Sequence, residues 1–155
     1  MAIWQARIQY VTGSVGIGHR SGLPARPGSV NFLIYNIGLS PEHAMVEVVK
    51  WTSFPLTEIV WKSDDTVSLI NPGEAQLFEY LTSEFDGTRY WGRIYVTSEN
   101  LVPSVEFMVE DDPSNPSVNP RVIGYYAPGD FAKFVLPYRI VGGLEGVTGG
   151  AVDKR

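Results

Sequence analysis

The sequence predicts an all-β fold, an antiparallel sandwich of about 8–10 short strands with no substantial helix. Apolar and polar residues alternate with a period of two in most segments, which is the periodicity of a strand buried on one face. Sixteen glycines and eleven prolines are scattered through the 155 residues and leave little room for long helices. No segment carries the apolar stripe of an amphipathic helix.

The predicted strands differ in how their apolar residues are distributed between the two faces. The first, 3–11, alternates strictly between apolar and polar residues, whereas 29–37, 43–52 and 89–98 are rich in β-branched and aromatic residues on both faces. Glycine accepts the positive φ of tight turns, so Asn71-Pro72-Gly73 predicts a turn and Asp86-Gly87 a hairpin. The ten predicted strands are 3–11, 29–37, 43–52, 57–62, 66–70, 75–81, 89–98, 104–110, 121–126 and 131–141.

Three stretches do not have the pattern of strands. Residues 12–28 and 111–120 are rich in glycine or proline and predict long loops, and residues 142–155 predict a flexible glycine-rich tail. The predicted organisation is therefore one sandwich domain over 1–141 followed by this tail.

Composition excludes several classes of protein. The net charge of −5 offers no basic surface for nucleic acid, and no apolar run is long enough to span a membrane. Without cysteine the chain forms no disulfide and no thiolate site. The N-terminus lacks the basic start and apolar core of a secretory signal, which favours a soluble cytoplasmic protein, although a mature chain whose signal was removed would look the same.

The sequence offers little for catalysis, and we expect neither an enzyme nor a cofactor. Its two histidines, His19 and His43, are interpreted as a loop residue and a strand-edge residue. A hydrolase would need one of them beside a serine and a carboxylate.

Acidic residues near the second loop could hold calcium, which prefers oxygen ligands. Glu110-Asp111-Asp112 would need a second loop, supplied by Asp64-Asp65 or by Asp130. The alternative is a solvated acidic turn that protects a strand edge, and it is favoured over a calcium site at Asp111 and Asp112.

Strands that are apolar on both faces predict an outer sheet face that is covered and not exposed to water. If one face of each strand enters the core, the apolar area of the second faces together exceeds that of the largest exposed patch on a typical monomer. A second subunit, a ligand or a segment of the same chain, such as 12–28, would then cover them. Glu47 and Arg93 share the second face and are expected to pair across neighbouring strands. The predicted interface residues are Tyr35, Met45, Val49, Trp51, Trp91, Arg93 and Tyr95.

Four runs resemble immunoglobulin-like accessory sandwiches of bacterial type, in which an N-x-G turn follows the second strand and a P-G-E turn precedes a hairpin. The resemblance covers about residues 29–110 and implies a binding or assembly module of immunoglobulin-like or jelly-roll type. The chain is also similar to the small β-sandwich transducers associated with sensory rhodopsins, which form oligomers. The runs are Phe32–Gly38, Ala44–Val48, Val67–Glu74 and Gly92–Ser98.

Two functions therefore remain open from the sequence. The first is a non-catalytic subunit that forms a homo-oligomer through an aromatic sheet face. The alternative is a carbohydrate- or small-ligand-binding module, with calcium assistance, in which Trp51, Trp61 and Trp91 stack on the ligand.

Overall fold

The computed structural model describes residues 4–16, 26–53, 56–64, 68–85, 89–110 and 121–141. Apart from one 3₁₀ turn, η2 (Pro128–Asp130), every regular element in these ranges is a strand. The strands are β1 (Gln5–Val11), β2 (Val15–Gly16), β3 (Arg26–Asn36), β4 (Glu42–Ser53), β5 (Leu56–Lys62), β6 (Leu69–Ile70), β7 (Ala75–Phe85), β8 (Arg89–Val96), β9 (Leu101–Val109), β10 (Arg121–Tyr126) and β11 (Ala132–Val141).

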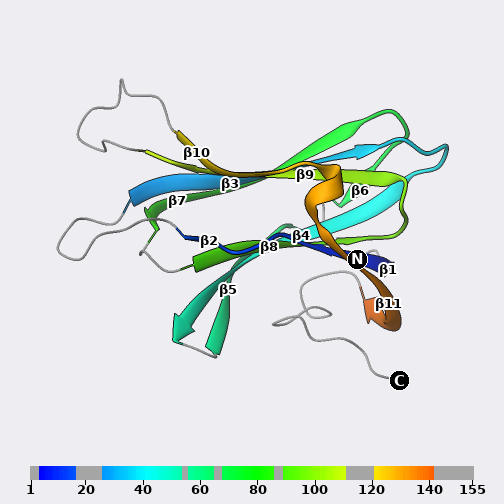
Figure 1. The fold of residues 1–155 in the computed structure, drawn as a ribbon. Helices are drawn as coiled ribbons and strands as arrows, with labels where there is room; N and C mark the ends of the chain where they lie inside the picture. Colours follow the sequence, from blue (N-terminus) through cyan, green and yellow to red (C-terminus); the bar gives the residue numbers. More distant parts are fainter. Residues whose placement is uncertain are drawn as a thin grey trace.

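Two antiparallel sheets pack face to face, which confirms the predicted all-β sandwich (Figure 1). The seven-stranded sheet has the order β11-β1-β8-β4-β5, with β2 beside β8 and β6 beside β4. The four-stranded sheet has the order β10-β9-β3-β7. The described ranges contain no helix of the length and hydropathy needed to cross a bilayer.

One apolar layer lies between the sheets. The central strands contribute alternate residues to it, as in β9, where every second residue from Leu101 to Val109 is buried. The four-stranded sheet supplies Phe32 and Phe107, and the seven-stranded sheet supplies Val46 and Ile94, all without exposed surface.

A buried asparagine organises one end of the sandwich. The Asn36 side chain donates to the carbonyls of Ser40 and Ile70, both at 2.9 Å, and its Oδ1 accepts from the Gly38 amide at 2.8 Å. Its backbone carbonyl accepts from the Gly73 amide at 2.9 Å. Because Gly73 has a φ of 77°, the predicted turn at 71–73 is confirmed and uses the glycine as expected.

Two predictions about connections were wrong. The expected hairpin at Asp86-Gly87 does not form, because β7 pairs with β3 in one sheet while β8 pairs with β1 and β4 in the other. The expected loop 12–28 contains β2, paired with β8, and ends where β3 begins at Arg26. Residues 17–25, and the predicted loop 111–120 and tail 142–155, lie outside the described residues.

Strand β9 begins three residues earlier than predicted, and it includes a proline. Pro103 lies opposite Ile34 of β3. Strand β10 ends opposite Val105, so none of the described strands other than β3 pairs with β9 at Pro103. Proline is tolerated at such an edge because no ladder bond needs its missing N–H.

Gly28 allows a close approach of three strands. It lies opposite Thr82 of β7 and Val109 of β9, beside a bulge in β3. A Cβ atom at this position would lie 2.2 Å from the Met108 carbonyl oxygen and 2.5 Å from Cε2 of Phe85. The ring of Phe85, which is fully buried, therefore requires glycine here.

We expect Gly28→Ala to destabilise the fold by about 1–3 kcal/mol, because the new methyl group must displace backbone rather than a flexible side-chain end. Urea unfolding followed by circular dichroism measures this loss. Gly129→Ala is the matched control, since nothing lies within 4 Å of a Cβ there. Equal stability of the two variants would contradict the packing described for Gly28.

Candidate functional site

The seven predicted interface residues do not share one surface. Tyr35 belongs to β3 and lies on the outer face of the four-stranded sheet, where it is 44% exposed. The other six belong to β4 and β8 and lie on the outer face of the seven-stranded sheet. Two separate surfaces therefore need to be considered.

Glu47 and Arg93 form the ion pair that the sequence predicted. They are directly opposite each other on β4 and β8, and Arg93 Nε lies 2.6 Å from Glu47 Oε1. The Nε–H bond is not aligned for a hydrogen bond, so charge attraction joins the two atoms. Glu47 has no exposed surface, and its second oxygen, Oε2, is buried without a hydrogen-bond partner.

Two more polar side chains extend this pair toward β1. The Tyr95 hydroxyl donates to Glu47 Oε1 at 3.0 Å and accepts from Gln9 Nε2 at 3.0 Å. Burial raises the pKa of Glu47, and the positive charge of Arg93 offsets only part of that rise. Burial also raises the pKa of the Tyr95 hydroxyl, and the negative charge of Glu47 raises it further.

Three of the predicted interface residues are already covered within the single chain. The side chains of Met45, Val49 and Tyr95 are each only 1% exposed. Met45 and Tyr95 form a second apolar cluster with Trp4 and Ala6, against which Leu136 of β11 packs. This corrects the expectation that they are open to a partner: a segment of the same chain covers part of this face, as one of the predicted alternatives allowed.

Trp51 and Trp91 line a shallow, open cavity at one end of the same face. Their ring centroids lie 6.3 Å apart and their planes meet at 80°. Trp51 is 37% exposed and Trp91 is half-buried. Val11, Thr12 and Ser14 complete its lining, and the cavity measures about 230 Å³.

The third tryptophan predicted to stack on a ligand does not lie with the other two. Trp61 packs against the core, 6.3 Å from the ring of Phe32 and 5.7 Å from that of Tyr80. Trp61 is therefore not part of the cavity that Trp51 and Trp91 line.

The acidic residues proposed for calcium are not brought together in the part of the chain described. Asp111, Asp112 and Asp65 lie outside the described residues. Asp130 accepts from the Ala127 amide at 2.9 Å and so caps the 3₁₀ turn. Among the described residues no group of three or more histidine or acidic side chains could hold a metal ion.

His43 has a serine neighbour, which the sequence could not show. Its Nδ1 lies 3.0 Å from Ser68 Oγ, and its ring stacks on Trp4 with 5.5 Å between centroids. The adjacent carboxylate, Glu42, instead accepts a hydrogen bond from the Thr97 hydroxyl. Ser68 is only 4% exposed, and no described carboxylate forms a salt bridge with the His43 ring. His19 lies outside the described residues.

The outer face of the four-stranded sheet carries exposed apolar side chains. Leu33 and Leu77 lie directly opposite each other on β3 and β7 and are 46% and 52% exposed. Tyr35 lies two residues along β3, and Leu81, on β7, is 69% exposed. Val122 and Tyr125 continue this surface on β10.

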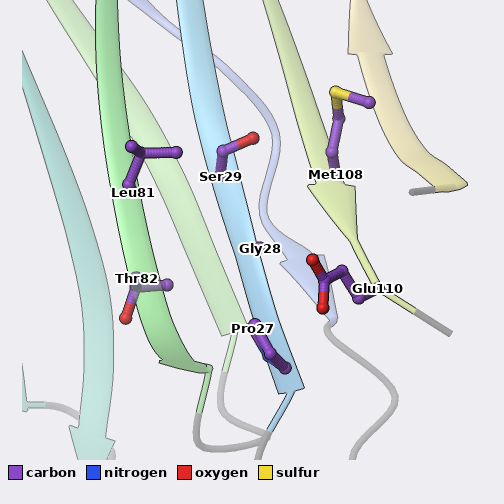
Figure 2. A pocket seen from close by; sticks show the side chains of 7 residues that line it. All are labelled: Pro27, Gly28, Ser29, Leu81, Thr82, Met108 and Glu110. Carbon is purple, nitrogen blue, oxygen red and sulfur yellow. The ribbon is translucent and has the colours of Figure 1, made fainter. Parts of the chain in front are cut away.

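A shallow groove of about 220 Å³ crosses one end of this face. Figure 2 shows Leu81, Ser29 and Met108 side by side on β7, β3 and β9, with Pro27 and Glu110 at the ends of their strands. The groove is mostly apolar, and Glu110 supplies its acidic end.

Sequence reasoning missed Leu77 and Leu81. The signal was present, because segment 75–81 places them on one face and Phe78 and Tyr80 on the other, so this strand too is apolar on both sides. Phe78 is the buried member, which leaves the two leucines outside.

Comparisons with family models, curated proteins and solved structures find no match to this chain.

We expect Glu47→Gln to flatten the pH dependence of stability. A pKa raised above the ordinary value of 4.5 means that the folded chain holds the proton more tightly than the unfolded chain. The stability that Glu47 contributes is therefore full below its unfolded pKa and is lost as the pH rises through the folded pKa. Unfolding in urea at a series of pH values measures this. Glu58→Gln, on an exposed residue of β5, is the control and should retain the wild-type slope.

Arg93→Met should cost about 3 kcal/mol at neutral pH, because it leaves the carboxylate of Glu47 buried without its counter-charge. In a Glu47→Gln background the same substitution should cost much less, since no buried charge is left unpaired. A double-mutant cycle from urea unfolding measures the coupling. Additive losses would show that the two side chains do not interact.

Proposed function

We propose that this protein is a non-catalytic subunit that binds a second copy of itself through the outer face of the four-stranded sheet. The observation that carries the proposal is the exposed Leu33–Leu77 pair, extended by Leu81 and Tyr35. Leu33, Leu77 and Tyr35 are neighbours in register and about half exposed, and Leu81 lies beyond Glu79 on the same face of β7. Monomers rarely leave large apolar side chains grouped in this way in water.

The shape of this face favours another sheet as its partner. The face is formed by side chains from four adjacent strands, and two sheets can pack face to face about 10 Å apart with their side chains interdigitating. A two-fold axis would place the same patch on both sides of the contact, so no second kind of surface is required.

Charge on the same face restricts how two copies meet. Asn31 lies between Glu79 on β7 and Glu106 on β9, which gives one acidic row across the sheet. Two such rows repel if they are superposed. This acidic row lies between the row of Leu33 and Leu77 and the row of Leu81 and Met108. The arrangement we propose therefore brings Leu33, Leu77 and Tyr35 of the two copies together and keeps the two acidic rows apart.

Of the seven residues named from the sequence, this proposal keeps Tyr35 and adds Leu33, Leu77 and Leu81. The aromatic face on the other sheet is not part of it.

We expect the wild-type chain to sediment as a dimer or larger oligomer, and Leu77→Glu to weaken the association at least about tenfold, because it places a charge within the apolar contact. Sedimentation velocity over a concentration series measures the mass. Leu39→Glu is the control, since Leu39 is 99% exposed in the turn after β3 and lies outside the patch.

Two results would contradict the proposal. One is a wild-type chain that stays monomeric at every concentration tested. The other is an oligomer whose mass is the same in the wild type, Leu77→Glu and Leu39→Glu. Circular dichroism of each variant ensures that a loss of association is not a loss of fold.

A further inference from the structure

We propose that the corner formed by Trp51 and Trp91 binds one pyranose ring of a glycan. The site lies on the seven-stranded sheet and is independent of the face assigned above to self-association. It goes beyond that function because it assigns the chain a ligand.

The two tryptophans form a corner over the shallow, open cavity. Trp91 lies directly opposite Val49 on β4, and Trp51 is the next outward residue on that strand. The two indole rings meet at 80°, so one can form a floor and the other a side wall. A cavity of about 230 Å³ is smaller than the ~300–1,000 Å³ that drug-sized ligands occupy, and it fits a single ring better than an extended molecule.

The wall of the cavity that Thr12 and Ser14 line is held in place by hydrogen bonds. The Thr12 amide donates to the Gly92 carbonyl at 3.0 Å, and the Gly92 amide donates to Thr12 Oγ1 at 2.9 Å. The Tyr126 hydroxyl, from the other sheet, donates to the Gly13 carbonyl at 3.1 Å. A wall that is fixed before binding loses little conformational entropy when a ligand arrives.

Polar donor groups of Arg89 and Ser14 lie at the rim of the cavity. Arg89 Nε donates to Ser14 Oγ at 2.9 Å, and its Nη2 donates to the Ser14 carbonyl at 3.1 Å. The Ser14 hydroxyl proton and the Arg89 Nη1 group are not used in these bonds. Hydroxyl and guanidinium donors beside an apolar floor match a sugar, which has a C–H face for an indole and hydroxyl groups at its edge.

The positive charge of Arg89 disfavours a quaternary ammonium ligand, which two perpendicular indole rings could otherwise attract. Quaternary ammonium groups bind in aromatic corners through cation–π attraction. Here Arg89 holds Ser14 at the rim, and Arg93 is the next outward residue after Trp91 on β8. Although Glu47 neutralises Arg93, the excess positive charge of Arg89 remains at the site, which favours a neutral or acidic ring.

The test uses the full chain and a panel of methyl glycosides of glucose, galactose, mannose and N-acetylglucosamine, together with glucuronate. Saturation-transfer NMR detects contact, and calorimetric titration measures affinity. We expect saturable binding of at least one sugar in the millimolar range, weakened at least about tenfold by Trp51→Ala. Tyr125→Ala, which removes an exposed ring from the other sheet, should bind as the wild type does.

The contribution of the half-buried Trp91 is tested with Trp91→Phe, which replaces the indole by a smaller aromatic ring. This variant should also bind the sugar more weakly. Leu77→Glu should bind the sugar normally, so failure of this proposal is distinguishable from failure of self-association. The proposal is overturned if no sugar of the panel binds, if Trp51→Ala binds like the wild type, or if tetramethylammonium chloride binds in place of the sugars.

Discussion

A β-strand has only two faces, and the apolar layer between the two sheets takes one face of every central strand. Once Phe32 enters that layer, Leu33 must point outward, and once Val46 and Ile94 enter it, Glu47 and Arg93 must lie on the opposite side. The exposed leucines on one sheet and the polar ladder on the other are therefore consequences of the same packing. Neither could be removed by sliding a strand, because a shift of one residue would expose the core.

Alternation within a strand was sufficient to predict most of the strands, the fold class and the pairing of Glu47 with Arg93, although β2 was missed. It could not tell which strands share a sheet. Asp86-Gly87 has the composition of a hairpin, yet the chain crosses between sheets there. For the same reason Tyr35 was grouped with Trp51 although they lie on different sheets. That Tyr95 is covered by packing near β11 depends on contacts distant in sequence, and composition does not encode them locally.

The outer face of the larger sheet is ordered along its length despite its polar content. It runs from the tryptophan corner through the Glu47–Arg93 pair and the Tyr95 hydroxyl to the stack of His43 on Trp4. Burying a carboxylate costs free energy even when it is paired, so this face is not optimised for stability alone. A fixed ion pair beside the tryptophans instead holds β4 and β8 in one register, and the angle between the indole rings depends on that register.

Strand β1 lies between β8 and β11, so Ile8 pairs with Val96 on one side and with Val135 on the other. During synthesis on the ribosome, β1 is made first and must wait for both neighbours. Until β11 emerges, the larger sheet has an open edge at β1, where another nascent chain could pair. A fold with so many distant pairings is also expected to form slowly. The order of synthesis therefore makes β11 the last strand to join the larger sheet, and its arrival moves the free edge of that sheet from β1 to β11.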